Sequence, residues 1–169
     1  GVAPIPVSRF LGDPSRKLET HHGKATITLW HDISNMFRWR TAFRTAVTSS
    51  RYSSLESNFL VGAESDGILN LARYEIPTTV QSHYLQNELH GNFTTGSIKH
   101  KTIIGIELGR ENSSATASGD FGGDTSTPGA FSYINIFNTN DRLFLNPALT
   151  KFSDASTQNN ILGAYFGDQ

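Results

Sequence analysis

The chain has 169 residues with a formal net charge of −1, from 14 Lys+Arg and 15 Asp+Glu, and it contains no cysteine. This composition excludes a disulfide framework, a zinc ribbon and thiolate catalysis, and it lacks the basic charge typical of nucleic-acid-binding proteins. There is no run of 18 apolar residues and no signal-peptide pattern, so we expect no transmembrane helix and a mature product or fragment. Ser, Thr, Asn and Gly make up more than a third of the residues and aromatic residues 11%, which favours β structure with long polar loops.

The first third of the chain predicts two strands joined by a short turn. A strand is expected at 18–31, whose centre alternates between apolar and polar side chains, and residues 33–36 have the character of a turn. From 37 to 48 the pattern has a period of two over twelve residues, with Arg38, Arg40 and Arg44 on one face and Phe, Trp, Thr and Val on the other. A helix would scatter the three arginines around its circumference, so this segment is predicted to be a strand.

The rest of the chain continues this alternation of strands and connections. We expect a loop at 49–70, a weaker strand at 71–93, a short turn at 94–97, a strand at 101–108, a long polar loop at 111–159 and a fifth strand from about 161. Alternate connections of a β-meander lie at the same end of the sheet. The two short turns are therefore expected at one end and the two long loops at the other. Outer-membrane barrels have this asymmetry, together with strands that are apolar outside and polar inside.

The predicted fold is therefore an all-β antiparallel meander that forms part of a transmembrane outer-membrane barrel, with long extracellular loops. The alternative is a soluble β-sandwich, whose strands also alternate but usually run only five or six residues.

No catalytic or metal site is predicted. The adjacent pair His21 and His22 would point to opposite faces of a strand and so cannot readily share one metal ion. Asp120, Asp124 and Asp141 have a spacing that matches no EF-hand loop, so surface polarity is the better interpretation. There is no G-x-S-x-G elbow and no glycine-rich phosphate loop opening a helix, so no enzyme is indicated.

Four segments resemble TonB-dependent siderophore receptors, in the order in which those receptors carry them. Each is short and degenerate, and their specificity lies in the combination. There are three modest departures from the family pattern, at Ala25, Glu107 and Gly167. The four segments are Arg9-Phe10-Leu11-Gly12-Asp13-Pro14, the strand–turn–strand from Leu29 to Arg44, the segment from Thr95 to Glu107, and Leu162-Gly163-Ala164-Tyr165-Phe166-Gly167-Asp168-Gln169.

The resemblance implies that residues 1–169 are about five strands of such a receptor's barrel domain, without its plug domain or TonB box. It implies a bacterial outer-membrane location and uptake of a ferric siderophore powered by the TonB–ExbB–ExbD system through the missing plug and TonB box. The other implied partner is outer-membrane lipid, and iron is carried only within the siderophore, with no cofactor. The siderophore itself is not indicated. The remaining alternatives are a soluble β-sandwich binding module and a passive porin-type channel.

Two sets of candidate site residues follow from this reading. Arg38, Arg40 and Arg44 are expected to face the lumen and pair with carboxylates of the plug, or else to form a solvated wall. Ferric siderophores are bulky and often anionic, which suits aromatic and guanidinium groups at the long-loop end of the strands. The alternative for each aromatic residue is that it packs against others to order a loop. The candidate ligand residues are Arg51, Tyr52, Arg73, Tyr74, Phe121, Phe131 and Tyr133, with Phe137 nearby.

Overall fold

The protein is all-β. The computed structural model describes residues 11–58, 67–120 and 132–169, and every regular element within them is a β-strand. These strands form one antiparallel sheet, which confirms the predicted all-β antiparallel fold class. They are β1 (Leu18–Asp32), β2 (Phe37–Ser57), β3 (Ile68–Thr95), β4 (Ile98–Asp120), β5 (Ser132–Asn135), β6 (Arg142–Leu143) and β7 (Thr150–Asp168).

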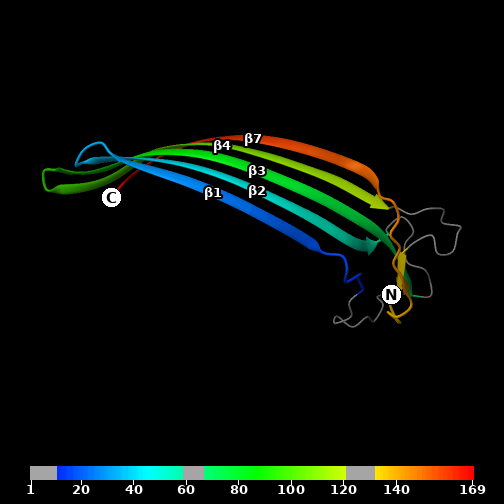
Figure 1. Ribbon diagram of the computed structural model, residues 1–169. Helices are drawn as coiled ribbons and strands as arrows, with labels where there is room; N and C mark the ends of the chain where they lie inside the picture. The colour runs from blue at the N-terminus through cyan, green and yellow to red at the C-terminus, as the bar shows by residue number, and fades with distance from the viewer. Residues whose placement is uncertain (1–10, 59–66, 121–131) are drawn as a thin grey trace. The chain divides into compact units, whose positions relative to one another are not determined.

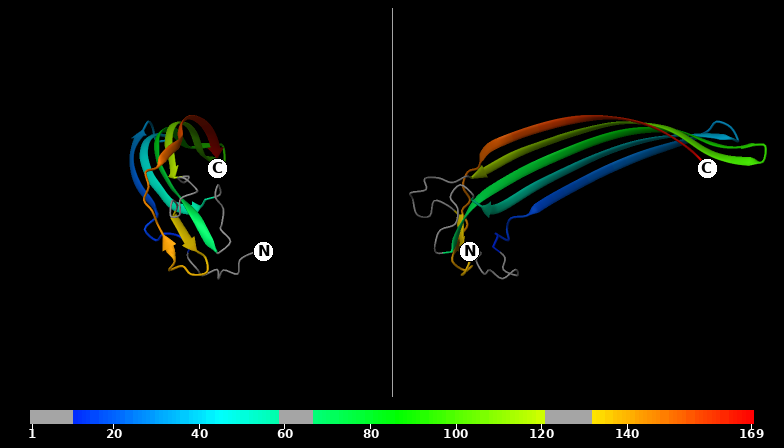
Figure 2. Two further views of the ribbon diagram at one scale, coloured as in Figure 1. Left: turned by 90° about the vertical axis from the view of Figure 1, so that its right-hand side faces the viewer. Right: turned by 180° about the vertical axis from the view of Figure 1, so that it is seen from behind.

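The long strands lie side by side in the order β1-β2-β3-β4-β7 (Figure 1), and Figure 2 shows the same order from behind. The short strand β5 pairs with β3 and with β6, off this main path. Strands β1 and β7 are the two edges, and the sheet is not closed. Nearly every residue of both edge strands is exposed.

The strands are longer than the sequence predicts, and the described residues contain seven of them where about five were expected. The expected loop at 49–70 is strand as far as Ser57 and again from Ile68, and the expected loop at 111–159 contains the end of β4, all of β5 and β6, and the start of β7. The pairing there is carried by the backbone: the Ser53 amide donates to the Lys17 carbonyl at 3.1 Å. Residues 49–57, 111–120 and 150–160 are largely polar on both faces, so they lack the alternation that reveals a strand in a sequence.

Both short turns are confirmed. In the first, the amides of Ile33 and Ser34 donate to the Phe37 carbonyl at 3.0 and 3.1 Å, and the Ser34 hydroxyl accepts from the Phe37 amide. In the second, only two residues separate β3 from β4, and Gly96 has a φ of 62°. Two-residue hairpins favour turns with a positive φ at this position, which glycine adopts without strain.

The chain divides into two compact units. The turn-side unit contains both short turns and consists of His21–Ser49, Thr79–Ser114 and Ser156–Gln169. The loop-side unit consists of Gly1–Thr20, Ser50–Thr78 and Ala115–Ala155. Within the loop-side unit, β5 pairs antiparallel with the start of β3, and the side chains of Leu71, Ala72 and Ile134 in these strands are buried.

Candidate functional site

The turn-side unit presents one face that is rich in exposed apolar side chains, named here the apolar face. Among its exposed members the exposed fraction ranges from 41% for Phe43 to 77% for Leu162, and Leu85 and Leu89 are half-buried. So many large apolar side chains on one face of the five long strands are unusual for a surface in water. The apolar face comprises Ile27 and Leu29 of β1, Trp39, Phe43 and Val47 of β2, Leu85 and Leu89 of β3, Ile104, Ile106 and Leu108 of β4, and Leu162 and Phe166 of β7.

Cross-strand contacts show that β2 and β3 share this face as their alternation predicts. The Thr41 hydroxyl donates to the Asn87 side-chain oxygen at 2.7 Å, and it accepts from the Trp39 indole at 2.9 Å. The Phe43 ring lies parallel to the His83 ring, with centroids 6.4 Å apart. The odd-numbered residues of both strands therefore point to the same side of the sheet.

The opposite, polar face of the same unit has the carboxylate of Glu88 at its centre. This carboxylate, only 9% exposed, lies 3.0 Å from Arg40 Nη1 and 2.9 Å from His90 Nε2, and it accepts from the Tyr165 hydroxyl at 2.5 Å. Gln86 joins the cluster by accepting from Arg40 at 2.6 Å and donating to Tyr165 at 2.9 Å. A buried carboxylate is tolerated where charge and hydrogen bonds compensate for its lost hydration, and this cluster provides both.

The three predicted lumen arginines share this polar face, and each has partners within the sheet. Arg38 forms an ion pair with Asp32, and both Arg38 and Arg40 lie over the Trp30 ring, at 5.8 and 5.7 Å from its centroid. Arg44 lies 5.0 Å from the centroid of the Tyr84 ring. Their expected pairing with a plug domain stays a prediction.

Two glycines of β4 make room for aromatic rings on the polar face. A Cβ atom at Gly105 would overlap the ring of Tyr165, and one at Gly109 would overlap the ring of Tyr84. The ring of Tyr165 is thereby held against the sheet with its hydroxyl group at Glu88. The sequence does not identify Glu88 as the centre of a cluster, because its partners Arg40, His90 and Tyr165 come from three other positions along the chain.

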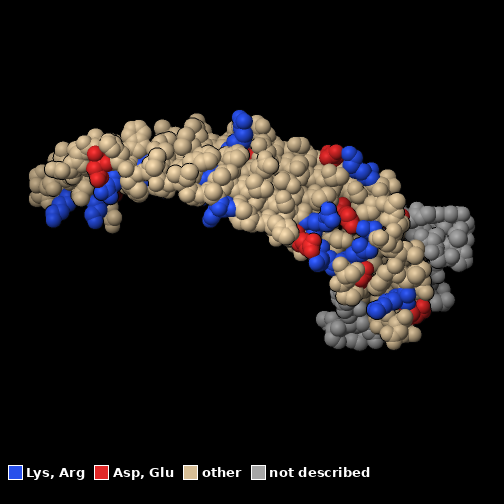
Figure 3. Space-filling view, viewed as in Figure 1, with Lys and Arg blue, Asp and Glu red and all other residues tan. Residues whose placement is uncertain are grey.

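In the loop-side unit, the predicted ligand residue Arg73 is bound to neighbouring chain segments. Arg73 donates to the side-chain oxygen of Asn146 and to Glu75, and to the Pro147 carbonyl at 3.3 Å. Arg16 donates to the same Asn146 oxygen at 3.4 Å. Charged side chains gather over this unit in the view of Figure 3. One asparagine thus ties the segment that precedes β7 to β3 and to the residues before β1.

The described aromatic members of the predicted ligand set also contact their own surroundings. The ring of Tyr74 meets that of Phe152 edge-on at 6.3 Å, and Tyr52 donates to Glu56 at 2.9 Å. Tyr133 donates to Asp141 at 3.2 Å, a hydrogen bond that raises the pKa of the Tyr133 hydroxyl.

Four candidate ligand residues remain. Arg51 and Phe137 are exposed, and Phe121 and Phe131 lie outside the described residues. The intramolecular contacts of Tyr52, Tyr74 and Tyr133 are those expected if aromatic residues order the loops, and a role in ligand binding stays a prediction.

The candidate metal-binding residues are dispersed. His21 and His22 are both exposed on β1, and His22 Nδ1 lies 2.8 Å from the Thr48 hydroxyl. Asp141 is bonded to Tyr133 and Asn135, Asp120 ends β4, and Asp124 lies outside the described residues. Within residues 11–58, 67–120 and 132–169, no group of three or more His, Cys, Asp or Glu is arranged to hold a metal ion. The same residues contain no helix long and apolar enough to cross a membrane.

Comparison with known proteins shows similarity of fold to solved structures. No protein-family model and no curated protein matches the chain. Seven solved chains match, among them BauA, the ferric preacinetobactin receptor from Acinetobacter baumannii, with a TM-score of 0.53 and 15% sequence identity. The match covers 89% of this chain and 27% of that one, so the chain spans about a quarter of the receptor's length.

Proposed function

We propose that this chain forms part of the barrel wall of an outer-membrane receptor that takes up ferric siderophores by TonB-dependent transport. The observation that carries the proposal is the apolar face of the turn-side unit. Leaving apolar surface in water costs about 25 cal/mol per Å², whereas the hydrocarbon core of a membrane covers it without that cost. A polar, hydrogen-bonded face on the other side of the same strands fits the water-filled or plugged lumen of such a barrel.

The arrangement of strands favours a barrel wall over a soluble sandwich. A sandwich covers its apolar face with a second sheet, and the described residues of this chain form a single sheet. In lipid, edge strands such as β1 and β7 require further strands, because unpaired backbone groups have no water to bond with. A match that covers about a quarter of a ferric siderophore receptor is the share expected of a few neighbouring strands from a large barrel.

We favour a receptor over a passive porin because of the structural neighbour and the sequence resemblance. On this reading the polar face lines the lumen, where Arg38, Arg40 and Arg44 are within reach of plug carboxylates. The loop-side unit lies toward the medium, where Arg51, Tyr52 and Tyr133 are candidate contacts for the siderophore. Energy would come from the TonB–ExbB–ExbD system.

The test is uptake of radioactive iron by whole cells. The gene that contains this sequence is deleted, and cells are given siderophores purified from the organism's own iron-starved medium and loaded with the isotope. We expect uptake to fall in the deletion strain, to return with the full-length gene on a plasmid, and to stop when a protonophore collapses the inner-membrane gradient. Uptake that survives the protonophore would point to a passive channel. Unchanged uptake in the deletion strain would contradict a role in siderophore import.

A further inference from the structure

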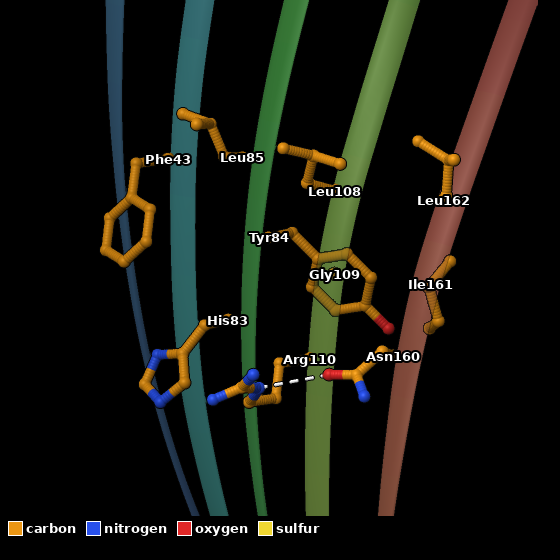
Figure 4. A pocket seen from close by; sticks show the side chains of 10 residues that line it. All are labelled: Phe43, His83, Tyr84, Leu85, Leu108, Gly109, Arg110, Asn160, Ile161 and Leu162. Atoms are coloured by element: carbon orange, nitrogen blue, oxygen red, sulfur yellow. Dashed lines mark hydrogen bonds between the residues drawn. The ribbon is translucent and has the colours of Figure 1, made fainter.

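A groove on the turn-side unit crosses β2, β3, β4 and β7, and its volume is about 470 Å³ (Figure 4). Most of its lining falls into two neighbouring rows that run across the strands, and Tyr84, Gly109 and Ile161 complete it. The first is the apolar row, made of Phe43, Leu85, Leu108 and Leu162. The second is the polar row, made of His83, Arg110 and Asn160 together with Thr45, which bonds to His83.

Hydrogen bonds hold the polar row together in two pairs. The Thr45 hydroxyl and His83 Nδ1 are 3.0 Å apart, and Arg110 Nε donates to the Asn160 side-chain oxygen at 3.1 Å. Figure 4 shows the guanidinium group of Arg110 between the His83 ring and the Asn160 amide. This bond to Asn160 is made through Nε and not through the terminal nitrogens of Arg110.

The charge of Arg110 is not balanced by a carboxylate in the described part of the chain. Arg110 is exposed, and the ion pairs found among the described residues do not include it. Its strand neighbours Glu107 and Glu111 occupy odd positions of β4, and Glu111 accepts from Tyr84 on the polar face. The apolar face therefore carries a positive charge directly beside its apolar row.

We propose that this groove binds an anionic membrane lipid, with the lipid phosphate on Arg110 and His83 and an acyl chain along the apolar row. A guanidinium group offers two parallel donors to a phosphate, and an arginine next to a membrane's apolar layer attracts anionic headgroups. The apolar row then continues toward the turns, where Ile104 and Ile106 extend the same surface for the chain. This inference rests on the proposed function, because it requires the apolar face to lie in a membrane.

The position of the groove along the strands is consistent with a bound lipid. Along β4 the residues of the apolar face are Ile104, Ile106 and Leu108, and the next residue on that face is Arg110. Along β7, Leu162 is likewise followed on the loop side by Asn160. On β4 and β7 the groove therefore straddles the edge of the apolar face, which is where a lipid changes from acyl chain to headgroup.

The test measures lipid binding to the full-length protein that contains this sequence, purified in detergent and analysed by native mass spectrometry. The probes are dioleoylphosphatidylglycerol, which is anionic, and dioleoylphosphatidylcholine, which is zwitterionic with the same acyl chains. We expect the wild type to bind the anionic lipid more tightly. Arg110→Gln should weaken that binding about fivefold, as the loss of one cation near a membrane surface predicts, and should leave binding of the zwitterionic lipid unchanged.

Two further variants sharpen the test. Arg110→Lys keeps the charge and should retain most of the preference for the anionic lipid. Arg142→Gln removes an exposed arginine of β6, outside the groove, and should change neither affinity. Equal binding of the two lipids by the wild type, or equal weakening by Arg110→Gln and Arg142→Gln, would overturn the lipid site. A protein that stays soluble and monomeric without detergent and binds neither lipid would instead overturn the proposed membrane location.

Discussion

Ile103 and Ile104 offer a matched test of which face of the sheet meets lipid. They are identical neighbours on β4, and alternation places them on opposite faces. Ile104 belongs to the apolar face and is 52% exposed. Ile103 is half-buried on the polar face, where it contacts the position of Gly167 on β7. Arginine at either position adds the same charge and the same bulk to the same strand.

The expected difference follows from the depth of Ile104 in the apolar face. On β4 that face is centred on Ile106, so Ile104 lies about 7 Å from the centre along the strand at about 3.3 Å per residue. At a strand tilt of about 40° this is about 5 Å in depth, well within a band about 25 Å tall. An arginine there costs about 2–3 kcal/mol. Ile103→Arg loses only part of a half-buried contact, at a cost of about 1 kcal/mol.

The measurement is reversible unfolding in denaturant of the full-length protein inserted in phospholipid vesicles, followed by tryptophan fluorescence. Ile104→Arg should lower the free energy of unfolding by at least 1 kcal/mol more than Ile103→Arg does, given the costs of about 2–3 and about 1 kcal/mol. Equal losses would refute the assignment of the lipid face. A larger loss for Ile103→Arg would show that the two faces have been assigned the wrong way round.

Three further predictions test the polar face, the loop-side unit and the topology. Gly105→Ala should destabilise the protein by about 1–3 kcal/mol, because the added methyl group overlaps the Tyr165 ring; in a Tyr165→Ala background the same change should cost far less, and an undiminished cost would contradict this contact. Asn146→Ala removes the acceptor shared by two arginines, and we expect it to cost about 1–3 kcal/mol and to speed proteolysis of the loop-side unit, whereas an unchanged cleavage rate would count against its tying role. Asn140→Cys should react with a membrane-impermeant maleimide on intact cells and Asn35→Cys only after the outer membrane is opened; the reverse pattern would invert the proposed topology.

The strands show which features of the fold can be predicted from local sequence. Alternation along 37–48 correctly predicts a strand with its arginines on one face, because the side-chain period of a strand is a local property. The same reasoning ends the strand near Thr48, nine residues too early. Beyond that point both faces are polar, and pairing through backbone groups leaves no trace in the side-chain pattern. Strand length in such segments is decided by the neighbouring strands that supply the hydrogen-bond partners.

By itself, the sequence determined the all-β class, the two short turns and the division of each strand into an apolar and a polar side. Only the tertiary structure decided which side chains meet across the sheet. Glu88 and Tyr165 are 77 residues apart yet share a hydrogen bond, and Arg110 reaches Asn160 from 50 residues away. These contacts depend on strand register, because a slip of one residue would move all the side chains of a strand to the other face. Register is a property of paired strands, so neither the Glu88 cluster nor the groove at Arg110 is visible in any single segment of the chain.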